Sequence, residues 1–258
     1  MDKILDKKSG EEIKKHMNNC YLNNIISRKG SININNIFDK NNIVSYFNVN
    51  IKNFTSFAGS YYFNGKDPLV NTSLEYLKNN KLNFKESYLY KYYEKFQPKT
   101  YGELYELSSK NKLHKIKSTS YFHPWIHDKP TNIFRAGLFG PKDITNVMHR
   151  SIRILNLIKN IKKYGYLPTK GDIVEGYILL NKEGDYRFLI TAGHHRVAVL
   201  TAMYMNGNKI YESIPVKYDD KRVNIRVVKE EKVDEWPGVK SNWLKREDAI
   251  EMFNKYFN

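Results

Sequence analysis

The most regular pattern of hydrophobic and polar positions lies in the second half of the chain. Residues 143–163 carry apolar side chains at helical spacing. The predicted stripe consists of Ile144, Val147, Met148, Ile152, Leu155, Ile158 and Ile161. A glycine turn follows, and then two apolar runs at 173–180 and 186–190 with a polar turn between them. From Val197 onward the spacing is again helical, so the predicted order is helix, turn, strand, hairpin, strand and helix.

The first half of the chain has a weaker pattern. Residues 44–63 are rich in aromatic side chains that partly alternate with polar ones, which predicts one or two strands or a buried extended segment. Helices are predicted over 71–80 and 87–96. Thr100 and Glu103 have the spacing of a capping box, so another helix is expected to begin there.

The two ends of the chain and the segment after the motif helix complete the pattern. A short helix is predicted over 11–22, and strand-like segments lie at 214–218 and 223–228. At the carboxyl end, an amphipathic helix is expected to begin near Ser241 or Asn242. Its apolar positions suit docking on the core.

The second predicted strand enters its helix through Gly193, His194, His195 and Arg196. Glycine allows the backbone to approach a ligand closely, and the first turn of a helix offers unpaired N–H groups and a positive dipole end. His195 and Arg196 add directional donors there, and an arginine fork matches phosphate oxygens. The tetrapeptide therefore indicates a phosphate-binding turn. The alternative is a simple helix cap with solvated basic side chains.

This ordered series, closed by Gly193 to Arg196, resembles the ParB and sulfiredoxin superfamily of nucleotide-binding domains. The similarity covers roughly residues 140–205, and the turn looks closest to the Gly-His-x-Arg turn of the free-serine-kinase branch. It implies an α+β fold with a ParB/sulfiredoxin-like core, which is a small mixed sheet with packed helices. A helical, aromatic-rich N-terminal extension would precede this core.

The resemblance also implies which residues bind the nucleotide. Gly193, His194, His195 and Arg196 would cradle the phosphates of ATP or ADP, together with Mg²⁺. The chain departs from sulfiredoxins, which have cysteine immediately before the His-Arg pair, because His194 stands there and the single cysteine is Cys20. No helix-turn-helix domain of the kind that chromosome-partitioning members carry is evident after the motif.

The domain organisation that follows has two parts. Residues 1–115 are predicted to form an N-terminal α+β extension that specifies the substrate. Residues 116–258 are predicted to form the nucleotide-binding domain with its C-terminal helix. The tyrosines of residues 88–101 could stack on bases or sugars, but tyrosine clusters more often form packing faces, and we favour that role.

Composition adds a strong positive charge to this picture. The chain has 258 residues and a formal net charge of +16. A basic surface can bind nucleic acid, but lysine is spread along the chain, and its excess together with abundant Asn and Ile is typical of an AT-rich genome. Attraction of a small anionic substrate explains the charge equally well. The single cysteine and the lack of a secretory or membrane-spanning segment favour the cytoplasm and no membrane partner. The oligomeric state stays open.

A kinase-like phosphotransferase acting on a hydroxyl of a small metabolite is the preferred function. Arg150 and Arg153 of the predicted helix over 143–163 could reach the bound phosphates, although ordinary solvated arginines are the alternative. Glu175 is the leading candidate for the catalytic base, with Asp172 in reserve and His194 as a further option. The other hypotheses are a nucleotide-gated DNA-binding protein and a non-catalytic nucleotide-binding subunit.

No metal site within the protein is predicted. His123 and His127 have the spacing of a helical metal pair, but Pro124 interrupts a helix through them and no third ligand is evident. A structural or substrate-contacting role is expected for these histidines.

Overall fold

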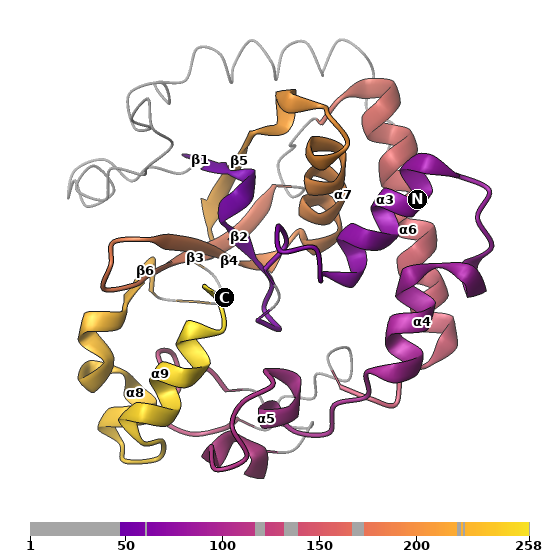
Figure 1. The fold of residues 1–258 in the computed structure, drawn as a ribbon. Coiled ribbons are helices and arrows are strands. Elements are labelled where there is room, and N and C mark those ends of the chain that lie inside the picture. The colour runs from indigo at the N-terminus through magenta and orange to yellow at the C-terminus, as the bar shows by residue number, and fades with distance from the viewer. Residues whose placement is uncertain are drawn as a thin grey trace.

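The computed structural model describes residues 47–59, 61–116, 122–131, 139–166, 173–220, 223 and 225–257. Within these residues a mixed sheet of six strands lies at the centre of an α+β fold (Figure 1). The strands are β1 (Phe47–Asn50), β2 (Phe54–Thr55), β3 (Val174–Leu180), β4 (Tyr186–Ala192), β5 (Ser213–Tyr218) and β6 (Val227–Lys229). Their order is β1-β5-β3-β4-β2, and β6 pairs with the second half of β3.

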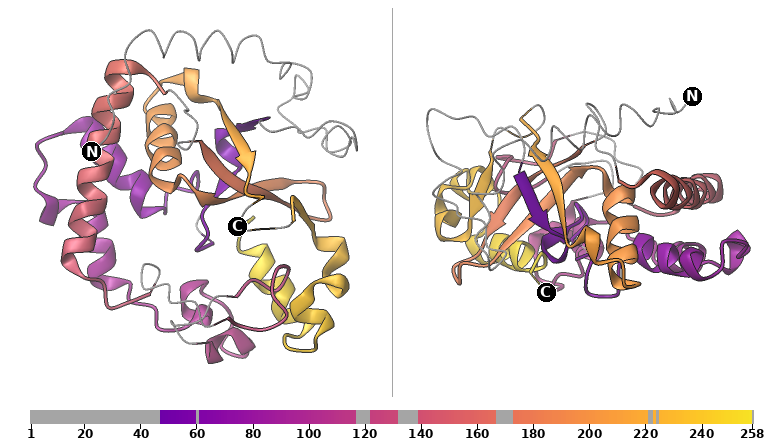
Figure 2. Two further views of the ribbon diagram at one scale, coloured as in Figure 1. Left: turned by 180° about the vertical axis from the view of Figure 1, so that it is seen from behind. Right: turned by 90° about the horizontal axis from the view of Figure 1, so that it is seen from above.

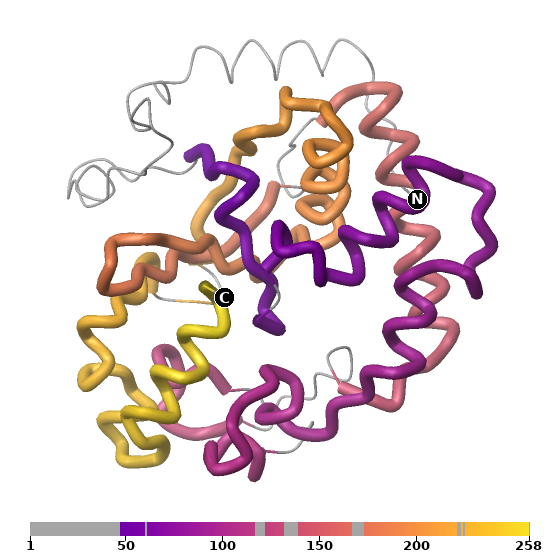
Figure 3. The backbone as a smooth tube through the Cα atoms, viewed as in Figure 1, coloured from indigo at the N-terminus to yellow at the C-terminus, as the bar shows by residue number. Residues whose placement is uncertain are grey.

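The pairing of the strands is partly antiparallel and partly parallel. β3 and β4 form the antiparallel hairpin that the polar turn between them predicted, and β1 pairs antiparallel with β5. β2 is parallel to β4, and both β5 and β6 are parallel to β3. Figure 3 shows the early segment of β1 and β2 beside the later strands, and the strand order places β1 next to β5 and β2 next to β4 at opposite ends of the row. Strands of the predicted N-terminal extension thus complete the sheet of the second part, while the division at residue 115 stays a prediction.

Helices cover both faces of the sheet. They are α3 (Pro68–Lys78), α4 (Tyr88–Lys95), α5 (Tyr101–Leu104), α6 (Ile144–Tyr164), α7 (His194–Met205), α8 (Pro237–Lys240) and α9 (Arg246–Asn254). Seen from above in Figure 2, α3, α6 and α7 lie on one side of the sheet and α8 and α9 on the other. None of these helices, nor any other in the described part of the chain, could cross a bilayer.

Two hydrophobic cores follow from the alternation of side chains along the strands. On β4, Phe188 and Ile190 face the core that includes α3, α6 and α7, while Leu189 faces the core beneath α9. β3 divides in the same way, because Ile178 belongs to the first core and Tyr177 to the second. A sheet that is buried on both faces explains why the predicted strands carry apolar residues almost without interruption.

Local signals fix the ends of α6. The side chain of Asp143 accepts a hydrogen bond from the Thr145 backbone N–H (2.9 Å) and caps the helix. The helix ends at Gly165, whose φ of 77° is the left-handed conformation that glycine adopts without strain. The predicted helix over 143–163 is therefore confirmed.

The predicted apolar stripe of this helix was wrong in part. The buried positions are Val147, Ser151, Ile154, Ile158 and Ile161. Ile144, Met148 and Ile152 are instead 50%, 39% and 45% exposed. The exposed row is spaced by four residues and the buried row by three and four, and the buried row, which contains a serine, is the one that packs against α3 and α7.

Other predicted elements agree with the structure except at their ends. Strands or an extended segment within 44–63 are confirmed by β1 and β2, and the helices predicted over 71–80 and 87–96 by α3 and α4. Thr100 caps α5 and Glu103 donates its N–H to the Thr100 side chain (3.2 Å), but α5 is a single turn. The helix predicted over 11–22 lies outside the described residues.

The predicted elements of the C-terminal segment differ more from the structure than the others do. Within the described residues, the strand predicted over 223–228 is confined to its last two positions, because β6 spans Val227–Lys229. The terminal helix begins at Arg246 and not near Ser241, because α8 occupies Pro237–Lys240 and the chain then turns sharply, with Asn242 at φ 58°. This turn buries Leu244 before the helix starts.

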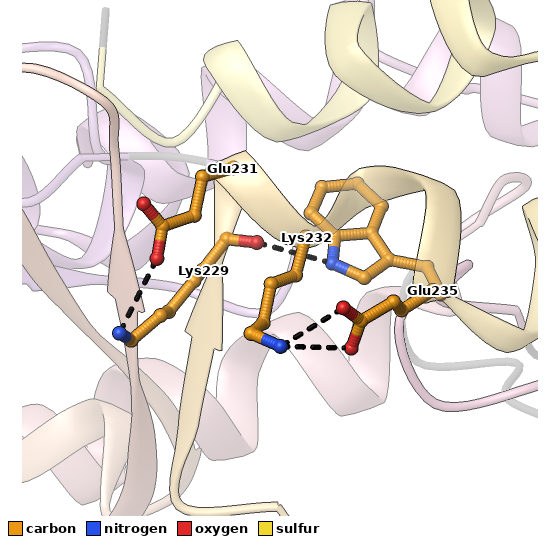
Figure 4. A network of polar contacts seen from close by, with 5 residues as sticks. Lys229, Glu231, Lys232 and Glu235 are labelled. Atoms are coloured by element: carbon orange, nitrogen blue, oxygen red, sulfur yellow. Dashed lines mark hydrogen bonds and ion pairs between the residues drawn. The ribbon is translucent and has the colours of Figure 1, made fainter.

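Two ion pairs lie in the segment between β6 and α8 (Figure 4). Lys229 contacts Glu231 at 3.3 Å and Lys232 contacts Glu235 at 2.9 Å. Lys229 is 34% exposed and the other three side chains are more than half exposed, so solvent screens these pairs and they contribute little to stability. Trp236 also holds this segment in place. Its side chain is buried, and its indole N–H donates to the Lys229 carbonyl (3.3 Å).

Candidate anion-binding site

The predicted phosphate-binding turn lies where β4 passes into α7. Gly193 has φ 99° and ψ 13°, a left-handed conformation. A Cβ at this position would also lie 3.0 Å from Cγ2 of Val174 on the neighbouring strand β3. Both the conformation and the close approach require glycine. The twelve-residue helix α7 begins directly after it, with its positive dipole end at His194 and His195.

His195 is the most perturbed group of this turn. Its Nε2 atom is buried and finds no hydrogen-bond partner among the residues that the structure describes. The pKa of His195 is lowered to about 3. Burial is the main cause, and the charges of Arg150, Arg153, His194 and Arg196 act in the same direction. The imidazole is therefore neutral at pH 7. A buried polar atom without a partner, surrounded by positive groups, is suited to an anionic ligand.

Helix α6 supplies two arginines to this site. Arg150 and Arg153 lie close enough to His195 for their charges to lower its pKa. Arg150 donates a hydrogen bond from Nη1 to the hydroxyl of Tyr93 on α4 (2.8 Å), and its guanidinium lies 5.5 Å from the centre of that ring. Arg153 is exposed. The structure thus brings both sequence-predicted arginines to the turn.

His194 contacts a different part of the chain. Its Nδ1 atom lies 3.0 Å from the hydroxyl of Tyr62, which is completely buried. Burial raises the pKa of Tyr62 well above its usual range, and the nearby Asp67 carboxylate adds to the effect. Asp67 itself caps α3 by accepting from the N–H groups of Leu69 (2.9 Å) and Val70 (3.0 Å). The wall of the site is therefore formed by the segment that leads into α3.

Glu175 lies beside the turn but is directed elsewhere. It pairs with Ala192 in the register of β3 and β4, and its carboxylate forms an ion pair with Lys217 of β5 (2.7 Å). Its neighbour Val174 faces Gly193, so alternation along β3 directs Glu175 to the opposite face of the sheet. The structure therefore does not bring this carboxylate together with His195. The reserve candidate Asp172 lies outside the described residues.

Three residues of the site were missed by the sequence analysis. Tyr62 and Tyr93 contact His194 and Arg150, and Lys142 precedes α6 next to Arg150. Burial and the charge of Arg150 lower the pKa of Lys142 to about 7. Tyr93 belongs to the tyrosine cluster for which we expected a packing role, and no local pattern distinguishes it from its neighbours.

His123 and His127, the pair with metal-like spacing, contact other protein groups within the described part of the chain. His123 is completely buried, with Nδ1 3.0 Å from the Tyr177 hydroxyl and Nε2 3.1 Å from the Tyr105 hydroxyl. The Nδ1 atom of His127 accepts from the His123 backbone N–H (3.3 Å). Both ring nitrogens of His123 thus have partners in the second core.

The arrangement can bind an anion through three kinds of donor. Helix N–H groups, the His195 imidazole and the guanidinium groups of Arg150 and Arg153 come together from α6 and α7. Such a set of donors matches the oxygens of a phosphate. Comparison with known proteins gives no match for this chain among protein-family models, curated proteins or solved structures.

Proposed function

We propose that this protein binds the phosphates of ATP or ADP at the N-terminus of α7 and transfers a phosphoryl group to a hydroxyl of a small metabolite. The observation that supports this proposal is the environment of His195. Its Nε2 atom is buried without a partner in the described structure, and positive groups converge on it. A dianionic phosphate satisfies the orphaned atom and is attracted by the positive groups around it.

Each group of the turn has a role in this proposal. The N–H groups of the first turn of α7 and the His195 imidazole donate to phosphate oxygens, while Arg196 and Arg150 neutralise their charge. Gly193 lets the backbone approach the ligand without a side chain in between. Arg153, which is exposed, adds charge at the entrance of the site.

The catalytic base in this proposal is His194. The acceptor oxygen attacks the terminal phosphorus, the bond to the leaving nucleotide oxygen breaks, and His194 takes the hydroxyl proton. The contact of its Nδ1 atom with the buried Tyr62 hydroxyl holds the ring in place. Glu175 is less suited to this role, because it is paired with Lys217 on the other face of the sheet.

Mg²⁺ accompanies nucleotides in most phosphoryl-transfer enzymes. Across the described part of the chain, no group of three His, Cys, Asp or Glu side chains is positioned to hold a metal ion. In such sites Mg²⁺ keeps several water ligands and is bound by the nucleotide phosphates together with only one or two carboxylates. In our proposal, the residues of the chain position the phosphates and accept the hydroxyl proton.

The turn also supports a relationship with the ParB and sulfiredoxin superfamily, in its free-serine-kinase-like branch. Its motif stands between an antiparallel hairpin strand and a helix, as that superfamily requires. The single cysteine in 258 residues is consistent with a reducing compartment, and we place the protein in the cytoplasm.

Calorimetric titration with ATP, ADP and CTP in the presence of Mg²⁺ tests the proposal. Arg196→Ala should weaken adenine-nucleotide binding by about a hundredfold, as expected for loss of a charge-assisted contact to phosphate. Arg246→Ala is the matched control. Arg246 is an exposed residue at the start of α9 and is paired with Asp234, so this variant should bind nucleotide as the wild type does. Absence of binding by the wild type would refute the phosphate-turn assignment. Preference for CTP would favour the DNA-binding alternative.

A further inference from the structure

A cavity lies between α4 and the start of α6, two helices that pack side by side (Figure 1). Its volume is about 250 Å³, which is smaller than the pockets that hold drug-sized ligands and suits a small metabolite. The residues that matter to its chemistry are Tyr90, Tyr93, Glu94, Gln97, Lys142 and Ile144. Two aromatic rings and several polar groups thus surround the same small space.

The cavity adjoins the candidate anion-binding site through two side chains. Tyr93 lines the cavity, and its hydroxyl accepts from Arg150 (2.8 Å). Arg150 also lies close enough to both His195 and Lys142 for its charge to lower the pKa of each group. A molecule in the cavity would therefore lie next to phosphates bound at α7.

We propose that this cavity holds the phosphoryl acceptor and that the acceptor is a small polyhydroxylated compound, a sugar or a polyol. This inference rests on the proposed function, because it assigns the second substrate of the same site. The ring of Tyr90 offers apolar area to the C–H face of a sugar, whereas the Tyr93 ring already contacts the charged groups of Lys142 and Arg150. Hydroxyl groups both donate and accept hydrogen bonds, and the lining offers both kinds of partner.

Lys142 is held in the position that this role requires. Its backbone N–H donates to Oε1 of Gln97 (3.0 Å), and its ammonium group lies 5.2 Å from the centre of the Tyr93 ring. With a pKa of about 7, the side chain is present both as ammonium and as amine at neutral pH. It can therefore donate to a sugar hydroxyl or accept from one. Glu94 is exposed and supplies a carboxylate acceptor at the rim.

Saturation-transfer NMR on the full chain tests this inference with D-glucose, myo-inositol, glycerol and L-serine as probes. At least one of the three polyols should bind to the wild type. Ile144→Trp should weaken that binding by at least about tenfold, because the larger ring fills the cavity. Ile152→Trp is the matched control: Ile152 is similarly exposed on the same helix but does not line the cavity, so binding should persist.

A second variant removes the polar group without filling the space. Lys142→Met keeps the length of the side chain and should weaken polyol binding by about tenfold. Circular dichroism checks that each variant is folded. Failure of all three polyols to bind, or binding that Ile144→Trp leaves unchanged, would overturn the inference. Binding of L-serine alone would show that the cavity takes an amino acid and would overturn the proposed class.

Nucleotide titration of the same variants separates this inference from the proposed function. Ile144→Trp should bind ATP with the wild-type affinity, because Ile144 lies on the cavity side of Arg150 and has no role at α7. Polyol binding by a wild type that binds no nucleotide would remove the phosphoryl-transfer function. It would leave the cavity as a sugar-binding site.

Discussion

Acidification provides a direct test of the environment of His195. This histidine is buried and has a pKa of about 3 in the folded protein, against an ordinary value of 6.5 that we take for the unfolded chain. Below pH 6.5 the unfolded state binds a proton that the folded state does not bind. The free energy of unfolding must therefore fall as the pH falls through the window from 6.5 to about 3.

The magnitude follows from the difference between the two pKa values. Each pH unit inside the window costs about 1.4 kcal/mol for one group. Between pH 6.5 and about pH 4.5, His195 should therefore lower the stability by about 2 kcal/mol, because the unfolded histidine is already half protonated at pH 6.5. His195→Gln has a side chain of similar size that does not titrate, so this contribution should be absent from the variant.

Urea unfolding followed by tryptophan fluorescence at both pH values measures the difference, and Trp125 and Trp236 are buried reporters. All other titrating groups are common to the two proteins, so the difference between them isolates His195. If wild type and His195→Gln lose the same stability on acidification, the histidine is not buried among positive charges. In that case the argument for an anion site fails as well.

Four substitutions test the packing that supports the site, each by the midpoint of urea unfolding. Ile154→Ala should cost about 3 kcal/mol because the residue is fully buried, whereas Ile152→Ala should cost less than about 0.5 kcal/mol; equal costs would refute the orientation of α6. Gly176→Ala should cost about 3 kcal/mol, because a Cβ there would lie 2.1 Å from a backbone oxygen of β4; a neutral effect would contradict that approach. Tyr177→Phe removes the acceptor of the Trp125 indole N–H (2.9 Å) and should cost about 2 kcal/mol; an unchanged midpoint would mean that this buried bond is unimportant.

In the proposed function, the turn at the start of α7 binds the nucleotide and the cavity binds the phosphoryl acceptor. Groups at the N-terminus of α7 and on α6 carry positive charge, while α4 contributes two tyrosines and the Glu94 carboxylate to the cavity. Tyr93 and Arg150 belong to both regions and are joined by a hydrogen bond of 2.8 Å. A substitution at either residue should therefore affect both substrates, whereas Arg196 and Ile144 report on one each.

The sequence by itself determined the elements around the motif, because their signals are local. Asp143 caps α6, Gly165 ends it, and the left-handed conformation at Gly193 opens α7. A cap or a positive φ depends only on a few consecutive residues. The apolar runs of β3 and β4 and the polar turn between them likewise specify a hairpin without reference to the rest of the chain.

Only the tertiary structure decided which groups meet at that motif. Tyr62 and His194 are 132 positions apart, and Tyr93 and Arg150 are 57 positions apart, so no local pattern relates them. The orientation of α6 was undetermined because two of its rows are apolar, and packing against α7 selected the row with Ser151. The pairing of Glu175 with Lys217 depended on the register of β3 and β5. Contacts of this kind form only when the whole sheet is assembled, because each depends on burial and charge that distant segments provide together.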